Sequence, residues 1–305
     1  MAGEDAMTKP LPTNDELYRW ICLNEQPPKS GQFLPGQISS YRAHWRDLKR
    51  FCEQRNLLEH GFKGALSTNF HQRFWELYLS KAFDAAGIAL NRGKKGQPDF
   101  YFERDGQKVW IEAVACGEPQ KEQNKVPPPG DDFESGLNSS YENQTMQRMA
   151  SVISGKIKQF QKYKDNKVVT SNDICIIALN GWRALNGHPD AVVPNAPPMI
   201  FRVLFGVGDL ILSRKSLDAS PTYSHKRIKM SKNNAPLAHF IEPQNIGIAG
   251  VLYSTTNILE TRRDILGHDF IFIPNPVSPH AIPSILSPIV ELQKTSRKNL
   301  WSTAI

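Results

Sequence analysis

The order of helical and strand-like segments predicts an α/β protein, an α/β/α sandwich around a mixed central sheet. A helix, three short strands and a second helix follow one another between residues 69 and 164, and the apolar run 174–180 comes next. The Asp105-Gly106 turn joins two of the strands into an antiparallel hairpin. A strand reached through a helix pairs in parallel, so we expect a mixed sheet with helices on its faces.

A helical lead-in precedes this pattern. Residues 1 to about 35 are rich in Pro, Gly, Asn and Gln, and a short helical patch around 15–22 lies within this arm. Apolar residues at helical spacing then predict an amphipathic helix over residues 39–58 (Tyr41, Trp45, Leu48 and Cys52).

The predicted core starts with helix 69–86. Ser67 or Thr68 is placed to cap its first turn, and Gly87 follows its end, where glycine is common. The three expected strands cover residues 88–91, 99–103 and 108–115. The polar, proline-bearing stretch 117–138 is long for a loop in a compact domain, which makes it either functional or mobile.

The second half of the core and the rest of the chain complete the sheet. A long helix is expected over 143–164, and the continuous apolar run 174–180 is typical of a strand buried on both faces. Two further strands, 246–253 and 270–273, extend the sheet, and a short helix is expected in the last twenty or so residues. We therefore divide the chain into an N-terminal arm and helix, 1–60, a core, 61–181, and a C-terminal extension packed on the core, 182–305.

The composition is typical of a soluble globular protein, with 305 residues of which 40% are hydrophobic and 22% charged. We see no secretory leader and no apolar run of the ~20 residues that a membrane helix needs. The four cysteines form no CxxC pair, so no zinc site or disulfide framework is expected, and the simplest compartment is the cytoplasm. A net charge of +7 is compatible with a polyanionic partner.

Three acidic residues stand in unusual places. Glu112 lies inside an apolar strand, and Asp99 begins the strand before it. Because side chains alternate along a strand and the two strands form a hairpin, both acids can project on one side near its open end. Glu76 flanks the apolar stripe of helix 69–86, which draws it toward the sheet.

Carboxylates that converge in a partly dry site repel one another, and burial adds to the cost of their charge. A divalent cation relieves both problems, and magnesium commonly takes one or two carboxylates together with water and substrate phosphate. Glu112 is then explained as a metal ligand. The simpler alternative is that Glu112 faces solvent at a sheet edge or pairs with a nearby Lys or Arg.

The run Gln97-Pro98-Asp99, followed by Ile111-Glu112-Ala113-Val114, resembles the PD-(D/E)xK phosphodiesterase superfamily, whose restriction-endonuclease-like core has the same order of elements. The resemblance covers about residues 67–180. It implies hydrolysis of nucleic-acid phosphodiesters with Mg²⁺ or Mn²⁺, with Asp99 and Glu112 as metal ligands. Members often add a glutamate from the first helix, so Glu76 is implied as a further ligand or as a group that orients water.

One position departs from the family pattern. The lysine expected two residues after the second acid is replaced by Val114. Lys156, on the second long helix, is our first candidate for a migrated catalytic cation, and Gln120 and Lys121 are weaker ones. The other explanation is that the chain is a non-catalytic relative that binds nucleic acid or a partner protein.

Basic residues border the predicted site. Lys94 and Lys95 immediately precede the Pro-Asp pair, and Lys158 and Lys162 lie on the second long helix, where they suit a phosphate backbone. A further cluster is His225–Lys229. Exposed lysines also serve solubility alone. The leading hypothesis is a metal-dependent nuclease acting on DNA more than on RNA, with a possible homodimer for double-strand cleavage; a third hypothesis is an enzyme with another substrate.

Overall fold

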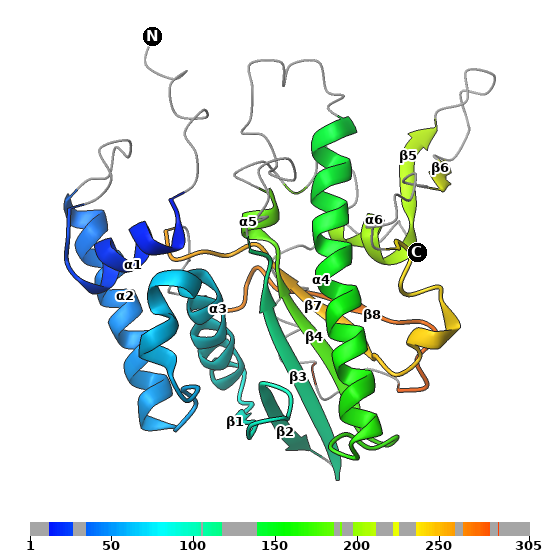
Figure 1. Ribbon diagram of the computed structural model, residues 1–305, viewed down its shortest axis with the longest axis horizontal. Coiled ribbons are helices and arrows are strands. Elements are labelled where there is room, and N and C mark those ends of the chain that lie inside the picture. Colours follow the sequence, from blue (N-terminus) through cyan, green and yellow to red (C-terminus); the bar gives the residue numbers. More distant parts are fainter. Residues whose placement is uncertain are drawn as a thin grey trace.

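The computed structural model describes residues 12–26, 35–104, 106–117, 139–185, 190, 198–211, 222–225, 236–259, 265–280 and 286. Within them the chain is mixed α/β, with one six-stranded mixed sheet (Figure 1). In spatial order its strands are β1 (Asn91–Arg92), β2 (Phe100–Arg104), β3 (Gln107–Ala115), β4 (Ile174–Asn180), β7 (Gly250–Ser254) and β8 (Ile271–Pro274). The pairs β3–β4 and β4–β7 are parallel, and the other neighbours are antiparallel.

Helices cover both faces of this sheet. On one face lie α1 (Asn14–Cys22), α2 (Pro35–Gln54) and α3 (Leu66–Ala85), with the short η1 (Phe62–Ala65) leading into α3. On the other lie α4 (Ser139–Asp165) and α6 (Met199–Phe205), and the short α5 (Trp182–Leu185) contributes residues to the cores on both faces. We call these the α3 face and the α4 face. Alternate residues of β4 enter the two cores: Ile174, Ile176 and Ala178 on the α3 face, and Cys175, Ile177 and Leu179 on the α4 face.

The N-terminal helices pack on α3 and fix its start. Thr13 caps α1 in a capping box with Glu16. The sequence-based expectation that Ser67 or Thr68 caps α3 is wrong, because the residue at its N-cap is Ala65 and no side chain caps it there. The backbone leaves helical geometry at Asn69, and the Asn14 side chain accepts a hydrogen bond from the His71 N–H (3.0 Å) just beyond this kink. A cap supplied by α1 cannot be read from the residues next to the helix.

The predicted first strand, 88–91, is also shifted. Ile88 instead closes the end of α3, because its N–H donates to the Phe83 carbonyl (2.9 Å) and Gly87 takes a positive φ. Only Asn91 and Arg92 pair with β2. The hairpin of β2 and β3 is present as predicted, with Phe100 opposite Ile111.

The C-terminal part of the chain adds β7 and β8 to the same sheet. In the segment 246–249, predicted as strand, Ile246 and Ile248 make turn hydrogen bonds with the preceding 3₁₀ turn η4 (Pro243–Asn245). Ala249 donates to the Cys175 carbonyl of β4 (2.8 Å), and β7 begins at Gly250. A separate two-stranded sheet joins β5 (Val207–Ile211) and β6 (Thr222–His225). The loop at 118–138 and the expected C-terminal helix lie outside the described residues.

The three predicted parts share one packed body within the described residues. The core on the α3 face joins Leu17 and Trp45 from the N-terminal part with Phe100 from the core and Phe270 from the extension. No helix in the described part of the chain is long and apolar enough to cross a membrane.

Candidate functional site

The site lies where the β2–β3 ladder ends. Phe100 and Ile111 form the last pair, and continuing the register places Asp99 opposite Glu112. The Asp99 carbonyl accepts a hydrogen bond from the Gly93 N–H (2.9 Å), and its carboxylate Oδ2 accepts one from the Ala113 N–H of β3 (2.9 Å). The Asp99 carboxylate therefore lies at the edge of the sheet, between the two faces.

Glu112 points from β3 toward α4. It is 3% exposed and shares its face with Trp110, which belongs to the α4-face core. Its Oε1 accepts a hydrogen bond from the Lys156 ammonium (2.8 Å). Its Oε2 is buried and has no hydrogen-bond partner among the described residues. Burial raises the pKa of Glu112, although the Lys156 ammonium opposes that shift.

This geometry removes one of the explanations offered for Glu112 and supports another. A solvent-facing acid at the sheet edge is excluded by its burial, whereas the pairing with a lysine is present. The lysine is Lys156, the residue expected to replace the cation missing at Val114. One paired oxygen and one unpaired buried oxygen leave this carboxylate only half compensated, which is costly unless something else contacts it.

Two further residues of α4 continue the hydrogen bonds from the Lys156 ammonium. Lys156 also donates to Gln159 Oε1 (3.2 Å), and the Gln159 amide donates to the Tyr163 hydroxyl. Burial and the nearby Glu112 charge raise the pKa of Tyr163 to about 12. Sequence reasoning did not single out Gln159 or Tyr163 for the site. Their signal was their position three and seven residues after Lys156, on the same side of a helix.

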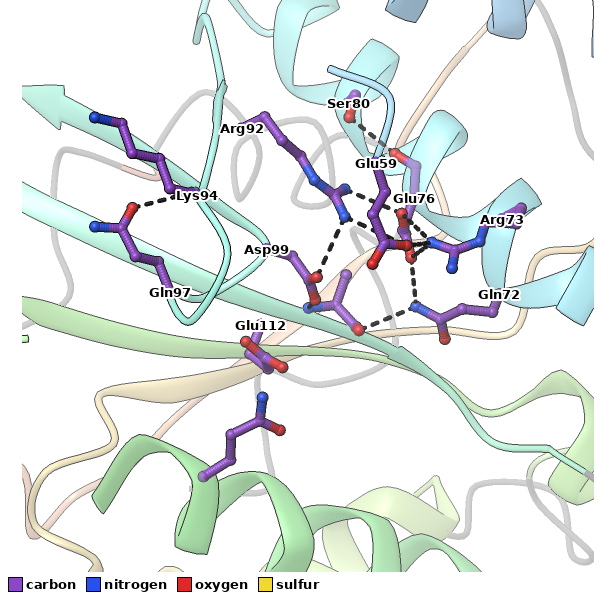
Figure 2. Close-up of polar contacts among 12 residues, drawn as sticks. Glu59, Gln72, Arg73, Glu76, Ser80, Arg92, Lys94, Gln97, Asp99 and Glu112 are labelled. Carbon is purple, nitrogen blue, oxygen red and sulfur yellow. Dashed lines mark hydrogen bonds and ion pairs between the residues drawn. The ribbon is translucent and has the colours of Figure 1, made fainter. Parts of the chain in front are cut away.

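Glu76 has a different environment, on the α3 face. Its carboxylate accepts hydrogen bonds from Arg73 (2.9 Å), Arg92 (3.0 Å) and the Gln72 amide (2.9 Å) (Figure 2). The Glu59 carboxylate pairs with Arg73 as well. Sequence reasoning missed both arginines. Arg73 had a local signal, because it lies three residues before Glu76 on the same helix. Arg92 had none, because it reaches Glu76 only when β1 lies beside α3.

Arg92 connects this cluster to Asp99. Its guanidinium lies over the Phe100 ring (4.7 Å to the centroid), and its Nη2 is 3.5 Å from Asp99 Oδ1. Figure 2 shows Asp99 between Arg92 and Glu112. Burial, then the neighbouring Glu112 and Glu76 charges, raise the pKa of Asp99 to about 7. The Arg92 and Lys156 charges oppose this shift in the pKa of Asp99 but do not cancel it.

The three acids do not form a single metal-holding cluster. Among the described residues, no group of three or more His, Cys, Asp or Glu is arranged to hold a metal ion. Glu76 is held in its arginine pairs, whereas Asp99 and Glu112 face each other across the end of the ladder. Two carboxylates, one with an unpaired buried oxygen, are a donor set of the kind that magnesium or manganese takes together with water.

The predicted nucleic-acid contacts lie on both sides of Asp99 and Glu112. Lys94 and Lys95 are exposed on the turn 93–98, and Lys158 and Lys162 are exposed on α4. The Lys94 side chain points away from Asp99 (Figure 2). Gly93 is required in this turn, because a Cβ there would lie 1.8 Å from the Pro98 carbonyl oxygen. Gln120, Lys121 and the segment 226–229 lie outside the described residues.

We compared the chain with known protein families, curated proteins and solved structures. No protein-family model, no curated protein and no solved structure matches the chain.

Proposed function

We propose that this protein is a metal-dependent phosphodiesterase that cleaves nucleic acid, DNA more than RNA, on a restriction-endonuclease-like core. The contact between Lys156 and Glu112 carries the proposal, because it brings a cation beside the acid whose expected lysine is missing at Val114. The helix–three strands–helix–strand order supports it. So does the raised pKa of Asp99, since a cation would relieve the repulsion by Glu112 and Glu76 that adds to the effect of burial.

Each residue of the site has a role in this proposal. Asp99 and Glu112 hold Mg²⁺ or Mn²⁺, and Glu112 Oε2 is the oxygen left for it. When bound, the ion supplies Lewis acidity at the phosphate and lowers the pKa of a bound water. Lys156 orients the attacking water and stabilises the charge that develops on the phosphate. Glu76, which was expected as a third ligand, positions Arg92 beside Asp99 instead.

The test is cleavage of labelled DNA and RNA, in single- and double-stranded form, with Mg²⁺, with Mn²⁺ and with EDTA. We expect the wild type to cut DNA in the presence of either metal, and Asp99→Ala and Glu112→Ala to lose that activity with an unchanged circular dichroism spectrum. Equal cleavage by the wild type and both variants would remove these acids from the mechanism.

A second candidate is a non-catalytic binding module on the same core. It is favoured by Val114, which replaces the lysine of the family pattern, and by the lack of a three-acid metal cluster in the described residues. Calorimetric titration with Mg²⁺ and Mn²⁺ separates the two. Binding near millimolar concentration that Glu112→Gln abolishes supports the enzyme, whereas no heat of binding by the wild type supports the module.

A further inference from the structure

Gly155 is in an unexpected position for a glycine. It lies in the interior of α4, a helix of 27 residues, and it is exposed. Glycine destabilises a helix interior relative to alanine. Gly155 does not have a positive φ, and a Cβ added there would have no described atom within 4 Å. Neither backbone conformation nor packing against the described residues therefore accounts for it.

The neighbours of Gly155 on the helix surface are basic and polar. Lys158, Gln159 and Lys162 follow it by three, four and seven residues, which places them on the same side of α4. Lys158 and Lys162 are exposed, and neither forms an ion pair with any residue in the described part of the chain. Gln159 contacts Lys156, whose ammonium reaches Glu112. This side of α4, which we call the Gly155 face, thus borders the candidate site.

We infer that the Gly155 face binds one sugar–phosphate backbone of the nucleic acid and leads it to Glu112. The inference rests on the proposed function and adds a binding surface to it. Glycine lets a ligand backbone approach a helix closely, because no Cβ stands in the way. Lys158 and Lys162, about one and two turns further along the helix, then neutralise phosphates of the same strand. Such contacts position a strand without reading its sequence, so the face takes any sequence.

A Gly→Ala pair tests the inference with a matched control. Gly155→Ala adds one methyl group to the Gly155 face, and Gly36→Ala adds one to α2, where Gly36 is exposed and has no described atom within 4 Å of an added Cβ. Both changes favour helix, so we expect each to leave the thermal midpoint equal or to raise it by about 2 °C. A loss of binding confined to Gly155→Ala then cannot come from unfolding.

The measurement is fluorescence anisotropy with labelled single-stranded and duplex DNA, in EDTA so that no strand is cut. We expect Gly155→Ala to bind at least 5-fold more weakly than the wild type, and Gly36→Ala to bind equally. Lys158→Gln and Lys162→Gln should each lower the slope of log K against log salt by about 1, for oligonucleotides of different sequence alike.

The outcomes separate this inference from the proposed function. Equal affinity of Gly155→Ala and the wild type overturns the Gly155 face and leaves the nuclease proposal standing. Weakened binding by Gly155→Ala, together with cleavage that survives Glu112→Gln, supports the face and overturns the catalytic assignment. A wild type that binds no DNA in any form overturns both.

Discussion

Two buried glutamates on opposite faces of the sheet differ in how their charge is compensated. Glu76, on the α3 face, has two arginines and an amide around its carboxylate. Glu112, on the α4 face, has one lysine at one oxygen and no partner among the described residues at the other. They are buried alike, with 5% and 3% of their surface exposed. Burial alone therefore does not tell a structural acid from a functional one.

The difference lies in what each carboxylate lacks. A buried charge is costly unless it is paired and its remaining lone pairs are satisfied. The protein meets that requirement at Glu76 and leaves it unmet at Glu112. An incompletely satisfied carboxylate is retained most readily where it has a ligand to bind, so we expect Glu112 to serve activity and Glu76 to serve stability.

The largest expected effect is on cleavage by Glu112→Gln. This change keeps the size of the side chain but removes the charge that would hold the metal, so we expect cleavage to fall about 1000-fold. The free energy of unfolding should change by less than about 1 kcal/mol, because Lys156 is 21% exposed and can turn to solvent. Urea unfolding beside a cleavage assay measures both. A large loss of stability with little loss of activity would show that Glu112 serves stability and not activity.

Glu76→Gln should show the opposite pattern. It removes the buried carboxylate that Arg73 and Arg92, each 12% exposed in its side chain, share, and leaves them the more exposed Glu59 and Asp99. Removing one member of a buried ion pair typically costs 3–5 kcal/mol, and we expect a loss of about 3 kcal/mol from the free energy of unfolding. Asp47→Asn is the control, because Asp47 is an exposed partner of Lys81 and should cost little. Equal, small losses for the two variants would contradict the structural role of Glu76.

The α4-face side of this comparison could be predicted from the sequence. Glu112 stood out because an acid interrupts an apolar strand, and Lys156 because a cation was missing at Val114. The hairpin register and the buried strand β4 followed from local patterns. On the α3 face, Arg73 lies at helical spacing from Glu76, but Arg92 could not be predicted from a local pattern. Arg92 meets Glu76 through the packing of β1 against α3, and contacts between distant segments leave no periodic signal.

The same limit explains the errors in the elements. Asn14 contacts the start of α3 from a position 57 residues before His71, so the local search for a cap chose the wrong residues. Residues 246–248 are apolar enough for a strand, but the 3₁₀ turn at Pro243 sets their backbone. Patterns within a segment predicted the long helices and the strands of the large sheet, but not α5, α6 or the β5–β6 pair. The ends of elements depended on individual hydrogen bonds, some from distant residues and some from local turns.

Lys156→Gln sharpens the comparison on the α4 face. The amide keeps a donor for Glu112 but removes the positive charge, so we expect cleavage to fall about 100-fold. Because Lys158 is exposed and does not contact Glu112, Lys158→Gln is the matched control and should lose far less at saturating DNA. Single-turnover rates measured at several DNA concentrations separate catalysis from binding. Equal losses in both variants at saturation would show that the lysines act only through net charge.

The smallest expected effect concerns pH and the α3 face. His71 is 2% exposed, and its Nε2 is 2.9 Å from Asn180 Oδ1, an acceptor, so the neutral ring donates there. Burial, followed by the Arg183 charge, lowers the pKa of His71 to about 3. The unfolded chain takes up a proton near pH 6.5 while the folded chain does not, so the contribution of His71 to stability is complete above pH 6.5 and is lost as pH falls toward 3.

His71→Gln tests this stability role, since glutamine keeps an amide donor for Asn180 and does not titrate. We expect the wild type to lose about 1.4 kcal/mol of unfolding free energy per pH unit below 6.5 from this residue, or about 2 kcal/mol by pH 5. The difference between the variant and the wild type should shift in favour of the variant by that amount between pH 7 and pH 5, in urea unfolding at each pH. A constant difference across this range would mean that His71 takes up a proton as readily in the folded protein as in the unfolded chain, and would remove its role in the pH dependence of stability.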